Sequence, residues 1–465
     1  MCGFAGIWGA ADEKAVGRML TRLAHRGPDA TGLHVQSQAA LGHRRLSIMD
    51  PAGGDQPLYN ERHSSVLVSN GEIYNFPQLR DALRARHTFA TSSDSEVVLH
   101  LYEDRRTEAV KALDGMFAFA LLDGEELFLA RDPLGIKPLY YGNLPTAGSQ
   151  SALTFASELK AFPANASEVK EFPPGTTYDS RAGFRQYYTL PNRPPRAAAP
   201  DAQAAHLRRV LEAAVEKRLM SDVPLGAFLS GGLDSSVIVA LARQHMPELH
   251  TFSVGLEGSR DLEAARTVAR HLDTIHHEYV YTAQEILAHL PEVLYHLESF
   301  DADLVRSAIP TFFCSRLAAQ HVKVILTGEG ADELFAGYTY HKSIAEPDAL
   351  HEELRRSVGA LHNVNLQRVD RLTMAHGLEG RVPFLDLTMV EAGQALAPEL
   401  KLRAARPQQR IEKWILRKAC EDLLPGEIVW RDKEQFDEGS GTVDALAQVL
   451  REAAGDLDFE AYRDR

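Results

Sequence analysis

A cysteine, Cys2, directly follows the initiator methionine in the opening sequence MCGFAGIWG. A thiol in a strand-like, apolar setting could be a nucleophile, because the thiolate is the reactive form of cysteine. The alternative is chance, since second residues are small in most proteins whose first methionine is removed. Cys2 alone does not decide between the two, so the residues that follow must.

The strongest chemical signal lies in PLGAFLSGGLDSSVIVALAR, residues 224–243, where an apolar strand leads into a loop and then an apolar helix. Two glycines let the backbone approach an anion, hydroxyls donate hydrogen bonds, and the helix N-terminus adds a positive dipole end. A glycine turn capped by Ser or Asp is the alternative. The ATPase motif GxxxxGK[ST] does not occur in the chain. The pattern predicts a phosphate-binding loop formed by Ser230, Gly231, Gly232, Asp234, Ser235 and Ser236.

A second loop of glycines and carboxylates follows a buried strand in VKVILTGEGADELFAGY, residues 322–338. Ligands of open α/β sheets bind at the carboxyl ends of the strands, where both loops are expected to lie. Asp234 and Asp332 could together hold Mg²⁺ on bound phosphate groups, because that ion prefers carboxylate oxygens. The alternative is that these acids only cap a helix N-terminus.

The elements that must position these groups fall into two parts, divided at YYTLPNRPPRAAAPDAQ, residues 187–203. Before it, short apolar strands such as residues 66–70 and 117–123 alternate with turns and a few helices, such as residues 78–85. After it, helices dominate from residues 206–219 onward, and each strand is followed by a helix, as in a parallel sheet. We predict a β-rich α+β domain over residues 1–190 and a helix-rich α/β domain with a parallel sheet over residues 191–465.

Composition limits the partners of the chain. Its 465 residues carry 50 Lys and Arg against 64 Asp and Glu, a net charge of −14, which disfavours nucleic acid or an anionic membrane surface. Small-molecule substrates are therefore expected. We predict a cytoplasmic protein, because the three cysteines have no paired spacing and the sequence has neither a signal-peptide pattern nor an apolar run of membrane length.

The pair His276-His277 has no third ligand at zinc spacing, so we predict no zinc site there.

Four polar motifs lie next to strands in the first hundred residues: HRGPD (25–29), GHRRLSI (42–48), SNGEIYN (69–75) and SSDSE (92–96). With Cys2 they resemble the class II glutamine amidotransferase domain, an N-terminal-nucleophile hydrolase with a β-sandwich and helices. The resemblance implies that Cys2, once Met1 is removed, attacks glutamine with its own α-amino group as the base. Asn70 and Gly71 would form the oxyanion hole.

The same resemblance implies a binding site for glutamine. Arg45 and Asp94 would hold its α-carboxylate and α-ammonium, and Glu72 would help to fix its polar head. The complete set implied is Arg45, Leu46, Ser47, Ile48, Met49, Asn70, Gly71, Glu72 and Asp94.

SGGLDSS resembles the pyrophosphate loop of enzymes that cleave ATP to AMP and pyrophosphate. Joined to the first domain, it resembles the glutamine-hydrolysing asparagine synthetases from Cys2 to about Gly441, with further matches at residues 131–141, 380–386 and 430–436. That family implies an adenylating domain in which Mg²⁺ and ATP activate aspartate before ammonia displaces AMP. Homodimers are common in it. The ATP residues implied, besides the loop of residues 230–236, are Leu229, Val254, Thr327, Gly328, Glu329 and Lys433, the last contacting the phosphates.

The chain departs from the family pattern at two places, and the second keeps another acceptor open. GEGADE stands where GEGSDE is usual, and Asp303 and Leu304 stand where a pair of threonines is typical. The alternative is a related ligase that amidates another carboxylate in a specialised biosynthetic pathway. A third hypothesis is a non-catalytic protein with a decayed synthetase fold, which the intact SGGLDSS, Asp332 and Lys433 disfavour.

Overall fold

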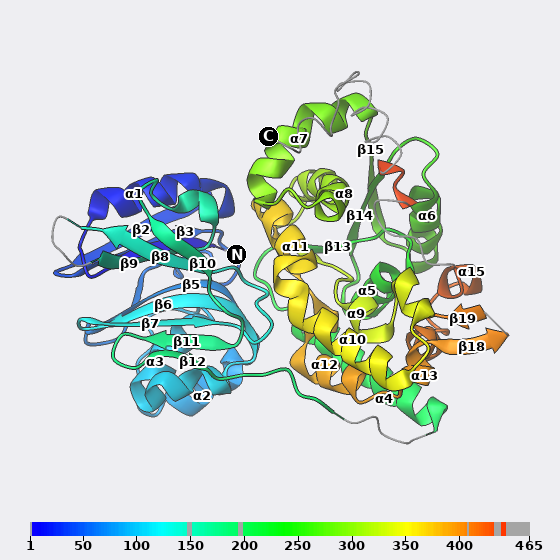
Figure 1. Ribbon diagram of the computed structural model, residues 1–465, viewed down its shortest axis with the longest axis horizontal. Coiled ribbons are helices and arrows are strands. Elements are labelled where there is room, and N and C mark those ends of the chain that lie inside the picture. The colour runs from blue at the N-terminus through cyan, green and yellow to red at the C-terminus, as the bar shows by residue number, and fades with distance from the viewer. Residues whose placement is uncertain (1, 147–150, 194–198, 407–408, 432–438, 443–465) are drawn as a thin grey trace.

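The computed structural model describes residues 2–146, 151–193, 199–406, 409–431 and 439–442, and shows two domains side by side (Figure 1). The first ends with strands that precede residue 187, and the second begins with a helix at residue 200. The N-terminus lies between the two domains (Figure 1). In the described part of the chain, none of the helices combines the length and the apolar character needed to cross a membrane.

The first domain is a sandwich of two antiparallel sheets. The first sheet has the order β10 (Ser167–Glu171), β8 (Tyr140–Pro145), β9 (Ser151–Ala156), β1 (Gly3–Trp8), β3 (Ala39–Arg45) and β2 (Ala30–Gln36). The second has the order β12 (Gly183–Gln186), β11 (Thr176–Asp179), β7 (Glu126–Arg131), β6 (Gly115–Asp123), β5 (Ser65–Ile73) and β4 (Leu58–Tyr59).

Helices cover the outer faces of this sandwich. Helix α1 (Glu13–Arg22) packs on the first sheet, and α2 (Phe76–Leu83) and α3 (Glu96–Arg105) lie on the second (Figure 1). Apolar side chains of both sheets, such as Phe4, Val68 and Leu129, form the core between them. The result is the α+β sandwich predicted for this domain, with β1 and β5 carrying the candidate nucleophile and oxyanion residues toward the second domain.

The second domain is built on a parallel sheet with the order β15 (Ile275–Val280), β14 (His250–Gly255), β13 (Leu225–Phe228), β16 (Val324–Leu326) and β17 (Glu379–Arg381). Helices surround it (Figure 1). They are α4 (Pro200–Lys217), α5 (Leu233–His245), α6 (Arg260–Leu272), α7 (Ala283–Leu297), α8 (Ala302–Ala318), α9 (Ala331–Phe335), α10 (Pro347–Ala360), α11 (Asn365–Met374), α12 (Leu387–Gln394), α13 (Pro398–Lys401), α14 (Trp414–Ala419) and α15 (Gly426–Val429).

Smaller elements complete the chain. Strands β18 (Arg403–Arg406) and β19 (Gln409–Ile411) form a separate antiparallel pair. Short 3-10 helices cover residues Ala24–Arg26, Arg106–Ala112, Leu159–Ala161, Thr339–Ser343, Leu361–Asn363 and Pro383–Leu385. The loops after β13 and β16 leave the carboxyl ends of adjacent strands, which is where parallel sheets place their ligands.

Candidate functional site

Cys2 and Asn70 come from the two different sheets of the first domain and are in direct contact. Cys2 is buried immediately before β1, and its backbone N–H donates a 3.0 Å hydrogen bond to Asn70 Oδ1 on β5. Asn70 Nδ2 is buried and has no hydrogen-bond partner among the described residues. Because the acceptor oxygen is already engaged at the chain start, the amide presents its donor for another acceptor, as an oxyanion hole requires.

Gly71 is the second residue of the predicted oxyanion hole. It has φ +150°, and a Cβ added there would lie 1.9 Å from the Met116 carbonyl oxygen of the paired strand β6. A side chain therefore cannot occupy this position without separating β5 from β6. The sequence pattern NG within a strand is explained by this close approach.

Buried carboxylates lie next to this pair. Asp94 accepts a 2.7 Å hydrogen bond from the Ile73 N–H, and burial raises the pKa of Asp94 to about 6. Burial, together with the negative charges of Glu379 and Asp94, raises the pKa of Glu72 well above its usual value. Arg381 of the second domain lies 3.4 Å from Glu72 Oε1 and donates to Glu379 Oε1 at 2.6 Å. The carboxyl groups of the first domain are thus electrostatically linked to β17.

The Arg45 guanidinium is enclosed by the loop that follows it, residues 49–55. Its guanidinium donates to Asp55 Oδ1 at 2.7 Å and to the carbonyl oxygens of Met49, Asp50 and Pro51 at 2.6–3.2 Å. A glutamine carboxylate would have to join or replace these acceptors. Of the neighbouring residues in the predicted glutamine set, Leu46 and Ile48 are buried, Met49 is half-buried, and the Ser47 N–H donates to Asp29 Oδ2 at 2.8 Å.

The second site is a cavity of about 1270 Å³ at the carboxyl ends of the parallel strands. It is lined from both predicted loops and from helix α8, so the sheet brings together segments about a hundred residues apart in the sequence. Lining residues from the predicted set are Leu229, Ser230, Gly232, Asp234, Ser235, Thr327, Gly328, Glu329 and Asp332. Asp303 and Leu304, which differ from the family pattern, also line the cavity, together with Arg306.

The SGGLDSS loop is held by its own hydroxyls. Ser235 Oγ accepts from the Ser230 N–H at 3.2 Å and lies 3.1 Å from Ser230 Oγ. Gly231 has φ +73°, and a Cβ there would lie 2.5 Å from Ala264 Cβ of α6. The loop can lie this close to α6 only because residue 231 is glycine.

Lys413 was not predicted to belong to this site, yet it contacts Asp234 and Asp332, the two predicted metal-binding carboxylates. Its ammonium pairs with Asp234 Oδ2 and lies 2.6 Å from Asp332 Oδ1. Lys413 is buried immediately before α14. The stretch EKWILRKA, residues 412–419, contains Lys413 but does not indicate its partner, because the contact joins residues 179 positions apart.

The remaining predicted residues lie in other environments. Val254 is buried in the apolar cluster around Tyr281 and Phe312 and is not among the cavity-lining residues. Ser236 is fully buried in α5, and its Oγ has no hydrogen-bond partner among the described residues. Gly231 forms the turn against α6. Lys433 lies outside the described residues.

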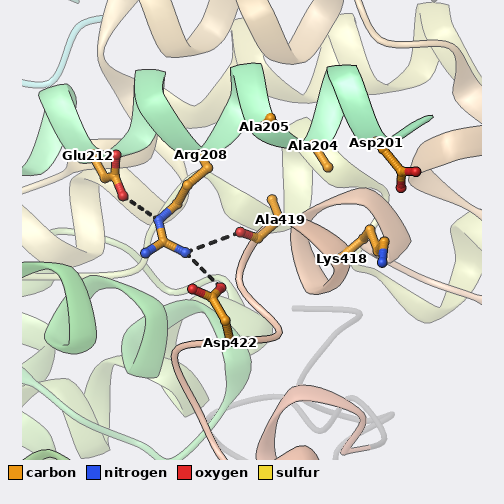
Figure 2. A pocket seen from close by; sticks show the side chains of 8 residues that line it. All are labelled: Asp201, Ala204, Ala205, Arg208, Glu212, Lys418, Ala419 and Asp422. Atoms are coloured by element: carbon orange, nitrogen blue, oxygen red, sulfur yellow. Dashed lines mark hydrogen bonds and ion pairs between the residues drawn. The ribbon is translucent and has the colours of Figure 1, made fainter. Parts of the chain in front are cut away.

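A second hollow, of about 430 Å³, lies between α4 and α14 (Figure 2). Figure 2 shows Arg208 joined to Glu212, Asp422 and the Ala419 carbonyl. Lys418, the other basic side chain in its lining, pairs with Glu421. Because both cations are engaged, this hollow is not suited to phosphate.

The two domains meet through buried charged groups beside Cys2. Arg26 donates to the Cys2 carbonyl at 2.9 Å, to Glu158 at 2.6 Å, and to Asp370 on α11 at 2.7 Å. Lys137 of the first domain approaches Asp370 at 3.8 Å and the Gly380 carbonyl at 3.5 Å. The candidate nucleophile is therefore anchored directly to the domain interface.

Comparison with known proteins agrees with this two-site arrangement. Residues 1–184 match the glutamine amidotransferase domain family, and residues 206–347 and 342–464 match the asparagine synthase family. The chain is 42% identical over 465 residues to asparagine synthetase [glutamine-hydrolyzing] 2 of Arabidopsis thaliana, covering 95% of this chain and 79% of that one. The chain belongs to the glutamine-hydrolysing asparagine synthetase family.

Further relatives extend the family comparison. The asparagine synthetase [glutamine-hydrolyzing] 2 of Oryza sativa subsp. japonica is also 42% identical, over 98% of this chain and 80% of its own. Among solved structures, a glutamine phosphoribosylpyrophosphate amidotransferase from B. subtilis covers 52% of this chain and 64% of that chain, at 24% identity and a TM-score of 0.35. That structural likeness is too weak to add to the assignment, which rests on the family matches.

Proposed function

We propose that the chain makes asparagine from aspartate, glutamine, ATP and water, releasing glutamate, AMP and pyrophosphate. The observation that carries this function is that one chain of this family contains both a Cys2–Asn70 pair and a cavity lined by the two predicted phosphate-binding loops, those of SGGLDSS and GEGADE. The relatives, all named asparagine synthetases, do not favour the alternative of another carboxylate acceptor.

The first half-reaction is the hydrolysis of glutamine by Cys2. After Met1 is removed, the Cys2 amine takes the thiol proton, and Sγ attacks the glutamine amide carbon. Asn70 Nδ2 and the backbone at Gly71 stabilise the oxyanion, and the proton passes to the departing ammonia. Water then cleaves the γ-glutamyl thioester. Burial raises the pKa of the Cys2 thiol, so a nearby base is needed to form the thiolate.

The second half-reaction takes place in the cavity. The SGGLDSS loop and the N-terminus of α5 would bind the pyrophosphate of ATP, while the aspartate β-carboxylate attacks the α-phosphorus. Asp234 and Asp332 offer hard oxygen ligands at the cavity wall, which fits Mg²⁺, and that ion would neutralise charge on the leaving pyrophosphate. Lys413 orients both carboxylates. Leu229 would contact the adenosine, and Lys433 remains a proposed phosphate contact.

Ammonia must pass between the sites without being protonated in bulk water. Leu46, Ile48 and Met116 from the first domain belong to the same buried apolar cluster as Leu229 and Val382 of the second. This continuity supports a dry passage across the interface. The domain boundary at residue 190, a homodimer and a cytoplasmic location stay predictions from sequence and family resemblance.

The decisive experiment measures pyrophosphate release with Mg²⁺, ATP and ammonia over a panel of carboxylate acceptors, with the amidated product identified by mass. We expect aspartate to stimulate release and asparagine to form. Release with another acceptor and none with aspartate would keep the chemistry but replace the substrate. Absence of release with every acceptor, from a chain that still hydrolyses glutamine, would contradict the synthetase assignment.

A further inference from the structure

Two histidines and two glutamates from three separate segments converge at the outer edge of the first domain. Glu61 lies in the turn between β4 and β5, His87 follows α2, and His100 and Glu103 lie on α3. One potential ligand atom of each residue lies within 4.8 Å of the other three. The sites described above use none of these residues.

The spacing between these atoms suits one small cation. His87 Nδ1 lies 3.5 Å from a Glu61 oxygen and 3.4 Å from Glu103 Oε2. His100 Nδ1 lies 3.1 Å from Glu103 Oε2 and 3.9 Å from Glu61 Oε2. Tetrahedral zinc ligands about 2.0–2.1 Å from the metal stand about 3.3 Å from one another, so small side-chain movements would complete the geometry.

Neighbouring groups hold three of the four side chains as metal ligands require. The far ring nitrogen of His87 lies 3.0 Å from Asp104, and a histidine that binds metal usually directs its other nitrogen to a carboxylate or carbonyl in this way. The far ring nitrogen of His100 lies 3.6 Å from Glu96, beyond hydrogen-bond distance. The glutamates are also held, because Asn60 Nδ2 donates to Glu103 Oε1 at 2.8 Å and the Thr88 N–H donates to Glu61 Oε1 at 2.7 Å.

We propose that Glu61, His87, His100 and Glu103 form a binding site for a divalent transition metal of the zinc class. Two neutral imidazoles and two carboxylates would balance the charge of such an ion, and this mixture of nitrogen and oxygen ligands suits Zn²⁺ better than Mg²⁺. Its role is structural. The metal joins the β4–β5 turn to α3 and closes the segment from His87 to His100, which carries Asp94.

The rival explanation is an ion-pair cluster of protonated histidines that binds no metal. The test starts from the full-length Cys2→Ala chain, because the Cys2 thiol could itself bind zinc. After treatment with a chelator, we would titrate ZnCl₂ by calorimetry, count bound metal by mass spectrometry, and record thermal unfolding. We expect Glu61→Gln and His87→Gln in this background to weaken the site by more than about 10-fold and to remove its zinc-dependent rise in Tm.

Two controls locate the binding site. His63→Asn changes a histidine of the same turn that contacts Tyr59 and lies outside the cluster. His277→Asn changes another group of histidines, His250, His277 and His321, in the second domain. Both variants should bind zinc as the parent does at the site that Glu61 and His87 define. Binding that is unchanged in Glu61→Gln and His87→Gln, or that favours Mg²⁺ over Zn²⁺, would overturn the proposal.

Replacement of zinc by Co²⁺ gives a readout of geometry. A four-ligand tetrahedral site gives Co²⁺ an intense visible absorption, whereas scattered carboxylates give a weak one. We expect the absorption in the Cys2→Ala chain and its loss in the Glu61→Gln and His87→Gln variants of it. A spectrum that those two substitutions leave unchanged would overturn the proposed ligand set.

Discussion

At the residue scale, Cys2 separates the two half-reactions. We expect Cys2→Ala to abolish glutamine-dependent asparagine formation and leave ammonia-dependent formation near its original rate, because the cavity of the second domain does not include Cys2. Cys2→Ser is the matched variant that keeps the size of the side chain. The measurement is asparagine formed with each nitrogen source. Loss of both activities in a folded Cys2→Ala chain would mean that the sites do not work independently.

Asp94 should give glutamine use a dependence on pH. Burial raises its pKa to about 6, so the carboxylate gains a proton as the pH falls through 6 and loses its attraction for the glutamine ammonium. We expect kcat/KM for glutaminase to decline below about pH 6. Asp94→Asn should lower kcat/KM by roughly 10-fold or more and remove that acid limb. An unchanged limb in Asp94→Asn would assign it to another group.

Lys413 is a third test at this scale. Its ammonium holds the carboxylates of Asp234 and Asp332, so its loss leaves two like charges close together and frees their side chains. We expect Lys413→Met to reduce pyrophosphate release by at least about 100-fold, while glutaminase activity in the other domain persists. Lys418→Met, five residues farther along the chain and paired with Glu421, is the control. Equal losses in the two variants would indicate general damage to α14.

At the element scale, the loop before α5 depends on its distance from α6. We expect Gly231→Ala to destabilise the protein by about 1–3 kcal/mol more than Gly258→Ala does, and to weaken ATP binding. Both glycines have positive φ, but an added Cβ at Gly258 meets nothing within 4 Å, whereas at Gly231 it lies 2.5 Å from Ala264 Cβ. Chemical denaturation measures the difference. Equal losses would show that backbone strain alone matters.

Sequence patterns predicted most elements of this fold because their periodicity is local. The strand expected at residues 117–123 is β6, which begins two residues earlier, and the helix expected at 206–219 is α4, which begins at Pro200. Proline at the first turn of α4 resembles a linker in sequence but is well suited to a helix start. The SGGLDSS and GEGADE loops were found for the same reason, since each is a contiguous strand–loop–helix pattern.

Contacts made by distant segments could not be read from the sequence. Lys413 reaches Asp234 only through packing of α14, and the carbonyls around Arg45 come from a loop whose path no motif records. The prediction of no zinc site at His276 and His277 considered only ligands that are close in the sequence. Candidate metal ligands at positions 61, 87, 100 and 103 become neighbours only when the β4–β5 turn packs against α3.

At the scale of the whole molecule, the domain interface should determine how much ammonia reaches the synthetase site. Asp370→Asn weakens the buried contact with Arg26, which also holds the Cys2 carbonyl, at a cost of up to about 3–5 kcal/mol. We expect fewer asparagine molecules per glutamine hydrolysed, because a loosened interface admits water. Lys323→Met removes the exposed interdomain pair with Asp29 and should change stability by about 1 kcal/mol or less, with the ratio unchanged. If Asp370→Asn keeps the original ratio although its stability falls, the interface holds the domains together without retaining ammonia.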